Sequence, residues 1–407
     1  MLLLFISLTL TVLWGGGLII NKGIFQLGNF IHLLTLLSLW LVVYRAIVNK
    51  CLHGVYSVLN VLVYSSAIIA IKTKSLLIFF IFYEYRIIPI TLIVFLYGYQ
   101  PEKLQAASTL LLYTVVRSFP LLIILLKGEI TMTNSAFMTI PITMRFLIKT
   151  PIYLFHTWLP KAHVEAPIGG SIVLAGVLLK LGSYGLLLFI PLVKMNILIP
   201  FYYALRIVGP IIRSLICLRQ RDMKLLIAYS SVVHMSVVTL GLFRGSELGQ
   251  SCGLIIVLGH GLSSPILFAY AFWFYEYSHS RLMVNNSSNW PLIRVGFLGL
   301  VSLNMGVPPS LRLWAEVLMR IRVIRIMGWA IPAMLLIFFL GVAYNLYMYT
   351  SCFHSKFNNT SYSINTIQLL PACQTIFMGY GAFLCLDLFH LYLDIIHLIS
   401  PSIYTYK

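Results

Sequence analysis

The chain has 407 residues, of which 60% are hydrophobic and 9% are charged. A soluble domain carries about 25% charged residues, so this chain cannot cover a globule with polar surface, and we expect its solvent to be lipid. The net charge of +18 is typical of basic loops that set membrane orientation, and this explanation is simpler than nucleic-acid binding.

Apolar runs predict an all-α integral membrane protein with about thirteen or fourteen transmembrane helices, because about 20 apolar residues cross the hydrocarbon core. The first run is apolar from residue 2, so we interpret it as a membrane helix and not as a cleaved signal. In chain order the runs cover residues 1–20, 29–48, 54–71, 75–98, 108–126, 137–159, 168–190, 197–217, 225–243, 252–275, 295–307, 309–327, 329–350 and 368–400.

Basic residues recur in three of the predicted loops. Arg219, Arg221 and Lys224 form a cluster, Lys161 lies two crossings earlier, and Arg281 lies two crossings later. The span count therefore places these loops on one side of the membrane. The positive-inside rule predicts that this side is equivalent to the cytoplasm.

The sequence shows no signature of a bound cofactor. Its six cysteines include no close pair and no C-x-x-C, and it contains neither a dinucleotide fingerprint nor a P-loop. His156, His163 and Glu165 form a weak metal-site pattern, and we interpret the segment 156–167 as a rigid loop between helices. We expect no metal or cofactor on this chain.

Two ionisable residues interrupt the earlier apolar runs. Glu84 lies in IFFIFYEYRIIP, and Lys149 precedes Pro151 in RFLIKTPIY. A proline breaks or kinks a helix, and transporters place ion sites at such breaks. Arg86 lies on nearly the opposite helix face from Glu84, so we expect Lys149 to be its partner, with Arg145 one turn before Lys149. The alternative interpretation of these charges is a static ion pair.

Four further residues continue this pattern. Lys180 is residue 13 of the run 168–190, too deep to reach the membrane surface. His234 and His260 lie within apolar runs and titrate near neutrality, although a lone buried histidine is more often structural. Glu316 follows Pro308 and Pro309 and has Arg312 one turn before it, which permits either a proton relay or a held ion pair.

Several segments resemble a known family, the antiporter-like membrane subunits of respiratory complex I, and most narrowly its chain 4 group. The resemblance covers most of residues 75–355 in one order. It is carried by YEYRIIPITLIVFLYGYQPEKLQAASTLLLYT (83–114), HTWLPKAHVEAPIGGSIVLAGVLLKLGSYG (156–185), LIAYSSVVHMSVV (226–238), HGLSSPILFAYAFWFYEYSHSR (260–281) and NLYMYTSC (345–352).

The resemblance implies two inverted half-repeats, each with a broken helix, and a proton path. That path would use Glu84, Lys149, Lys180, His234, His260 and Glu316, with transfer from Lys180 through His260 to Glu316 for release. It further implies shortened N-terminal helices (1–74), an antiporter-like core (75–350), and a loop with a C-terminal helical segment (351–407). Arg117, Arg145 and Arg312 depart from the family pattern.

The resemblance also implies a cellular setting. The expected partners are other membrane subunits of complex I, especially neighbouring antiporter-like subunits, in the mitochondrial inner membrane. NAD, FMN, iron–sulfur clusters and ubiquinone would be bound by other subunits. Two alternatives remain at this point, a subunit of a multisubunit sodium/proton antiporter and a structural membrane-arm scaffold that does not pump.

Overall fold

The structure is a computed structural model, and helices make up nearly all of what it describes. The described residues are 34–35, 37–42, 54–73, 75–98, 100–127, 136–190, 199–243, 247–286, 291–308, 310–326 and 328–353, with Cys373, Ile376 and Tyr380. The helices are α3 (Gly54–Lys72), α4 (Leu76–Tyr85), α5 (Ile87–Tyr97), α6 (Lys103–Val115), η1 (Val116–Ser118), α7 (Phe119–Lys127), α8 (Ala136–Lys149), α9 (Trp158–Glu165), α10 (Ile168–Val173), η2 (Leu174–Leu178), α11 (Leu179–Phe189), α12 (Ile199–Arg219), α13 (Met223–Leu242), α14 (Glu247–Ser278), η4 (Met283–Asn286), α15 (Pro291–Met305), α16 (Leu311–Ile326), η5 (Gly328–Ala330) and α17 (Ile331–Phe353).

Seven helical stretches among the described residues are long and apolar enough to cross a membrane. They are Gly54–Lys72, Leu76–Tyr97, Lys103–Leu126, Ile168–Phe189, Met223–Leu242, Gly249–Glu276 and Ile331–Phe353. The predicted all-α membrane class is confirmed. The count of thirteen or fourteen spans stays a prediction, because residues 1–33 and most of 354–407 lie outside the described residues. So do most of the predicted runs 29–48 and 368–400.

The outer surface of the molecule is apolar, and charged side chains lie buried within a largely hydrophobic interior. Large apolar side chains face outward, such as Leu126 (66% exposed), Val295 (68%) and Phe339 (69%). Lys149 and Lys180 are at most 1% exposed. Because lipid solvates apolar surface and rejects charge, this distribution fits a bilayer environment.

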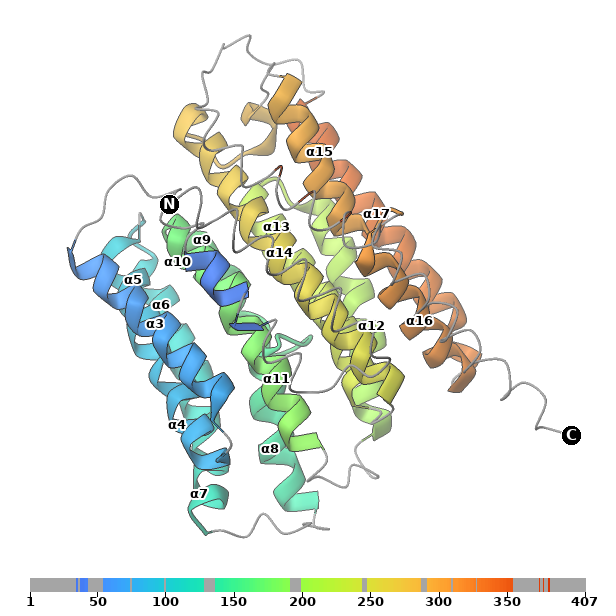
Figure 1. Cartoon of the computed structure of the whole chain (residues 1–407). Coiled ribbons are helices and arrows are strands. Elements are labelled where there is room, and N and C mark those ends of the chain that lie inside the picture. The colour runs from blue at the N-terminus through green and yellow to red at the C-terminus, as the bar shows by residue number, and fades with distance from the viewer. Residues whose placement is uncertain are drawn as a thin grey trace, which may run out of the picture.

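The long helices lie side by side in one elongated bundle (Figure 1). Helices α3 to α7 form one flank, α8, α10 and α11 lie in the middle, and α12 to α17 form the other flank. Helix α14 contacts α10, α11, η2, α13, α15 and α16. It therefore joins the middle of the bundle to the far flank, and its side chains reach both.

Three interruptions break the regular helices near the middle of the bundle. Helix α8 ends at Lys149, two residues before Pro151, and α15 ends at Met305, shortly before Pro308. Both predicted helix breaks are confirmed. Gly306 has φ +73°, a left-handed conformation that favours glycine and ends α15. The third interruption is the π-helical turn η2 (Leu174–Leu178), which was not predicted.

The interpretation of residues 156–167 as a loop was wrong, because Trp158–Glu165 forms helix α9. Pro160 suggested a loop, but it lies in the first turn of α9, where no intrahelical donor is needed. Helix α17 also continues to Phe353, slightly past the predicted boundary at 350.

The three basic loops meet at one end of the bundle. Met283 donates its backbone N–H to the carbonyl of Arg221, and Met223 donates to that of Arg281. The guanidinium of Arg281 lies 3.6 Å from the carboxylate of Glu165, on the same short helix as Lys161. The predicted placement of these loops on one side is confirmed.

Candidate functional site

The first part of the site is a partly buried carboxylate held by two cations. Glu84, near the end of α4, accepts a hydrogen bond at Oε1 from Lys149 Nζ at 2.6 Å. Arg145, one turn earlier on α8, donates to the same oxygen. The Arg145 guanidinium also lies 3.7 Å from the centre of the Phe80 ring, and Lys149 Nζ lies 3.7 Å from that of Tyr83. The predicted Glu84–Lys149 contact is present, and Arg145 joins it.

Lys180 lies at the interruption between η2 and α11 and is fully buried. Its ammonium donates to the carbonyl of Ala175, which lies in the π-turn. A π-turn widens the helix, and such turns recur at functional sites. Among the residues that the structure describes, no carboxylate forms an ion pair with Lys180. Within the described part of the chain, its hydrogen-bond partners are the neutral Ala175 carbonyl and the His260 ring.

Two histidines extend the site from Lys180 across the bundle. His260 Nδ1, on α14, lies 3.0 Å from Lys180 Nζ and 3.3 Å from the hydroxyl oxygen of Ser264. The ring centre of His234, on α13, lies 5.8 Å from that of His260. All three nitrogen bases are buried, so this is a continuous line of titratable groups at mid-membrane depth.

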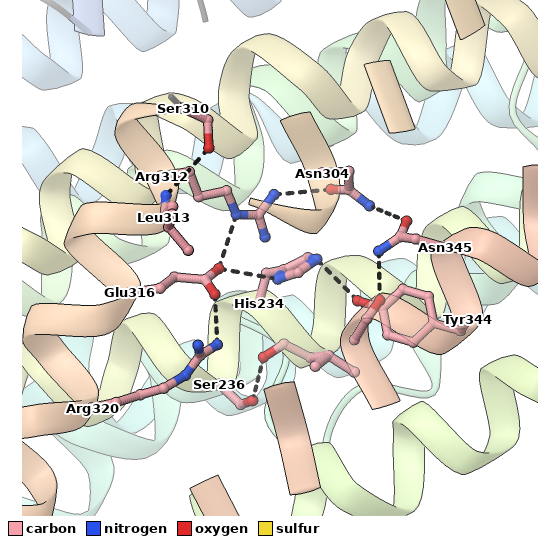
Figure 2. A network of polar contacts seen from close by, with 12 residues as sticks. His234, Ser236, Asn304, Ser310, Arg312, Leu313, Glu316, Arg320, Tyr344 and Asn345 are labelled. Carbon is pink, nitrogen blue, oxygen red and sulfur yellow. Dashed lines mark hydrogen bonds and ion pairs between the residues drawn. The ribbon is translucent and has the colours of Figure 1, made fainter. Parts of the chain in front are cut away.

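The line ends at Glu316 on α16 (Figure 2). His234 Nδ1 lies 3.7 Å from Glu316 Oε1, and Tyr344 Oη lies 3.1 Å from His234 Nε2. Arg312 donates from Nε to Glu316 Oε1 at 3.0 Å, and Arg320 donates from Nη2 to Oε2 at 2.6 Å. The possible Arg312–Glu316 pair is therefore present, and Arg320 is a second guanidinium on the same carboxylate.

The buried side-chain amides of Asn304 and Asn345 hold Arg312 on the side away from Glu316 (Figure 2). Arg312 Nη1 donates to Asn304 Oδ1 at 2.9 Å, and Asn304 Nδ2 donates to Asn345 Oδ1 at 2.9 Å. Asn345 in turn donates to the carbonyl of Gly341 at 2.8 Å. This chain of hydrogen bonds connects α15, α16 and α17 and sets the position of the Arg312 guanidinium.

The two parts of the site meet where α11 passes the end of α8. Gly182 on α11 faces Thr150 and the backbone of Lys149 so closely that an added Cβ would lie 2.9 Å from Thr150 Cγ2 and 3.4 Å from Lys149 C. Lys149 and Lys180 thus sit on helices in direct contact. The predicted site residues are brought together in two groups, Glu84 with Lys149 and Lys180 with the histidines and Glu316.

A polar cavity of about 540 Å³ opens at the basic end of the bundle. It is lined by side chains of both charge signs, which hold water better than lipid. The lining comprises Gln100, Glu102, Gln105, Ala106, His156, Thr157, Pro160, Lys161, Val164, Glu165, Arg213, Asp222, Leu225, Tyr229 and Arg281. His156 and Glu165 therefore border a water-accessible space. Within the described part of the chain, no three His, Cys, Asp or Glu side chains form a group that could hold a metal ion.

Sequence reasoning missed several contributors to the site. The Ala175 carbonyl depends on the π-turn, which no residue pattern signals. Tyr344 and Asn345 lie in an apolar run. Because polar side chains are costly in such a run, their presence there could have identified them as candidate site residues. Arg320 is one turn after Glu316, and the helical spacing that identified Arg312 applies equally to it.

Comparisons with known proteins agree on one family. Residues 73–343 match the family described as NADH:quinone oxidoreductase/Mrp antiporter, TM. NADH-ubiquinone oxidoreductase chain 4 of Albinaria caerulea is 36% identical over 323 residues, which cover 72% of this chain and 74% of the relative.

Solved structures share the fold at low sequence identity. A chain of respiratory complex I from Thermus thermophilus superimposes with a TM-score of 0.76 at 22% identity, over 89% of this chain and 84% of that chain. A chain of the Mrp complex from Dietzia sp. DQ12-45-1b gives a TM-score of 0.73 at 19% identity, over 88% of this chain and 44% of that chain. The same helical architecture therefore occurs in both kinds of assembly.

Proposed function

We propose, since this chain belongs to the chain 4 family of NADH-ubiquinone oxidoreductase, that it is a proton-translocating subunit in the membrane arm of that enzyme. The observation that carries the proposal is the buried line of Lys180, His260, His234 and Glu316. Lys180 Nζ lies 3.0 Å from His260 Nδ1, the ring centres of the two histidines lie 5.8 Å apart, and His234 Nδ1 lies 3.7 Å from Glu316 Oε1. Ionisable groups at this depth cost on the order of 3 kcal/mol each, so they are expected to serve a function.

Lys180 is the proton donor at the start of this line. Its ammonium donates to the Ala175 carbonyl, and His260 Nδ1 lies within hydrogen-bonding distance as an acceptor. The Glu84–Lys149 pair acts as a switch, because separation of the pair changes the electric field at Lys180. A pair at ~4 Å and an effective dielectric of ~20 is worth about 4 kcal/mol, roughly a 1,000-fold change in a proton equilibrium.

The polar cavity supplies the access route from the basic side of the membrane. It borders α9 and the last two residues of the loop that follows α8, His156 and Thr157. In this proposal, protons taken up there are transferred along the buried line toward Glu316.

The setting of the protein is part of the same proposal. The chain carries no nucleotide or metal motif, so NADH oxidation and quinone reduction belong to other subunits, which hold NAD, FMN, iron–sulfur clusters and ubiquinone. Its neighbours are other membrane-arm subunits, the antiporter-like ones above all. The names of its relatives favour the mitochondrial inner membrane.

The test is Lys180→Met in assembled membranes, with NADH:quinone turnover and proton uptake recorded together. We expect both to fall at least tenfold while assembly is normal, because methionine keeps the bulk and removes the proton carrier. The matched control is Lys72→Met, at an exposed position at the end of α3, which should leave both rates unchanged. Wild-type rates in Lys180→Met would leave only a structural role. Transport that followed a sodium gradient, independent of NADH, would favour the antiporter alternative.

A further inference from the structure

We infer that arginines hold both carboxylates of the buried line permanently ionised, so that its protons are carried by nitrogen bases alone. This inference rests on the proposed function and refines it. Arg145 acts on Glu84, and Arg312 and Arg320 act on Glu316. The resemblance to the family predicts that Glu316 receives the proton, whereas its contacts with Arg312 and Arg320 make it a fixed anion.

The evidence at Glu84 is a surplus of positive charge. Its Oε1 accepts from both Lys149 and Arg145, while Arg86 and Tyr83 flank it on its own helix segment. A guanidinium stays protonated under physiological conditions, so Arg145 remains a cation when Lys149 gives up its proton. Glu84 therefore keeps an ion-pair partner in both states of Lys149, and the Arg145 guanidinium continues to stabilise its ionised form.

The evidence at Glu316 is that both carboxylate oxygens are occupied by arginine donors. Arg312 Nε lies 3.0 Å from Oε1, and Arg320 Nη2 lies 2.6 Å from Oε2. The remaining group within reach of Oε1 is His234, at 3.7 Å, which itself contacts Tyr344 and faces His260. A proton on Glu316 would displace an arginine donor and leave a buried guanidinium nitrogen unpaired, which is costly.

The proton steps then balance without a carboxylic acid. Lys180 Nζ–H breaks as His260 Nδ1–H forms, so the lysine becomes neutral and the histidine becomes an imidazolium. His260 then loses its Nε2 proton as a ring nitrogen of His234 gains one, so His260 is neutral again and His234 is the imidazolium. The fixed anion Glu316 lies 3.7 Å from His234 Nδ1 and stabilises that imidazolium. Arg145, Arg312 and Arg320 are positioning residues in this scheme, because they act through the carboxylates.

Infrared difference spectroscopy of the assembled complex, recorded as NADH is added, tests the inference through the carboxylic-acid C=O stretching band. The forms to compare are wild type, the double variant Arg312→Met with Arg320→Met, and the triple variant that adds Glu316→Gln. The triple variant has no carboxyl group at this position, so a band that it lacks belongs to Glu316. The matched control is Arg117→Met, whose guanidinium lies over the Tyr113 and Phe155 rings and not on a carboxylate.

We expect wild type, the triple variant and the control to give the same band, because Glu316 contributes nothing to it. The double variant should gain up to one carboxylic-acid equivalent per chain, because no arginine then contacts Glu316, and lysine at both positions should remove the gain. A wild-type band that the triple variant lacks would overturn the inference, as would the absence of a gain in the double variant. Arg145→Met, with and without Glu84→Gln, repeats the comparison at Glu84 if the α16 variants do not assemble.

This readout separates the inference from the proposed function. The band reports the state of the carboxyl group whether or not the complex pumps. If Lys180→Met pumps like wild type and the bands are as expected, the proposed proton path is wrong and the inference about ionised carboxylates stands. If Lys180→Met loses pumping and wild type shows a Glu316 band, the path stands and Glu316 is itself a proton carrier.

Discussion

At the residue scale, the polar groups of the site depend on one another for their positions. Arg312 is held on one side by Glu316 and on the other by Asn304, which is itself held by Asn345. Each of these side chains is buried, so water cannot replace a lost partner. An amide that touches no titratable base can therefore still control the geometry of the proton line.

Asn304→Leu tests this dependence. The change leaves Arg312 Nη1 and Asn345 Oδ1 buried without the hydrogen bonds that they now share with Asn304, and each such loss costs about 1–3 kcal/mol. We expect a lower temperature of thermal inactivation of the assembled complex and a reduced turnover. The control is Ser65→Ala, at an exposed position with a hydrogen bond only within its own helix. Inactivation at the wild-type temperature would contradict the structural importance of this network.

At the element scale, helix ends and irregular turns create the site, and only some of them could be predicted. Pro151 and Pro308 signalled the breaks after Lys149 and before α16, because proline removes a backbone donor. The π-turn at Leu174–Leu178 had no such signal, since none of its residues is a proline. Segment 158–165 was misinterpreted, because a proline in a first helical turn looks the same in sequence as a proline in a loop.

The pairing of site residues was predictable to a similar extent. The Glu84–Lys149 pair was predicted from the free-energy cost of burying each charge and from the opposite signs of the two charges, because a carboxylate inside the membrane needs a cation. The contact of Lys180 with His260 joins residues eighty positions apart in the chain, and the sequence could nominate both but not bring them together. Helix α14 makes that contact by packing against α11 and η2, a matter of tertiary arrangement.

Gly182→Ala tests whether close approach of α11 to α8 couples the two parts of the site. The new Cβ would lie 2.9 Å from Thr150 Cγ2, so one helix must shift, at a cost of about 1–3 kcal/mol. We expect slower coupled turnover with less stable assembly. Gly341→Ala on α17 is the matched control, because its Cβ would meet nothing within 4 Å. Equal effects of the two substitutions would show that helix propensity, and not the approach of α11, is responsible.

At the scale of the whole molecule, the charge distribution predicts the orientation of the protein in the membrane. The ten acidic residues cannot balance 28 basic ones, and several of the basic residues gather at the end of the bundle where the polar cavity opens. By the positive-inside rule this end faces the cytoplasm-equivalent side, where NADH is oxidised in the proposed complex. The cavity would then open to the compartment from which protons are taken up.

Thiol labelling of oriented membrane vesicles with an impermeant maleimide tests this orientation. Lys161→Cys and Arg221→Cys place thiols at exposed positions of the basic end, while Ser75→Cys lies at an exposed position just before α4, whose continuation α5 ends at the basic side. We expect the first two to react only from the side that oxidises NADH, and Ser75→Cys only from the other, because one span separates them. Wild type corrects for Cys373, which is exposed, while Cys217, Cys252 and Cys352 are buried. Reaction of Lys161→Cys from the side opposite to NADH oxidation would show that the protein has the opposite orientation in the membrane. The polar cavity would then serve proton release instead of uptake.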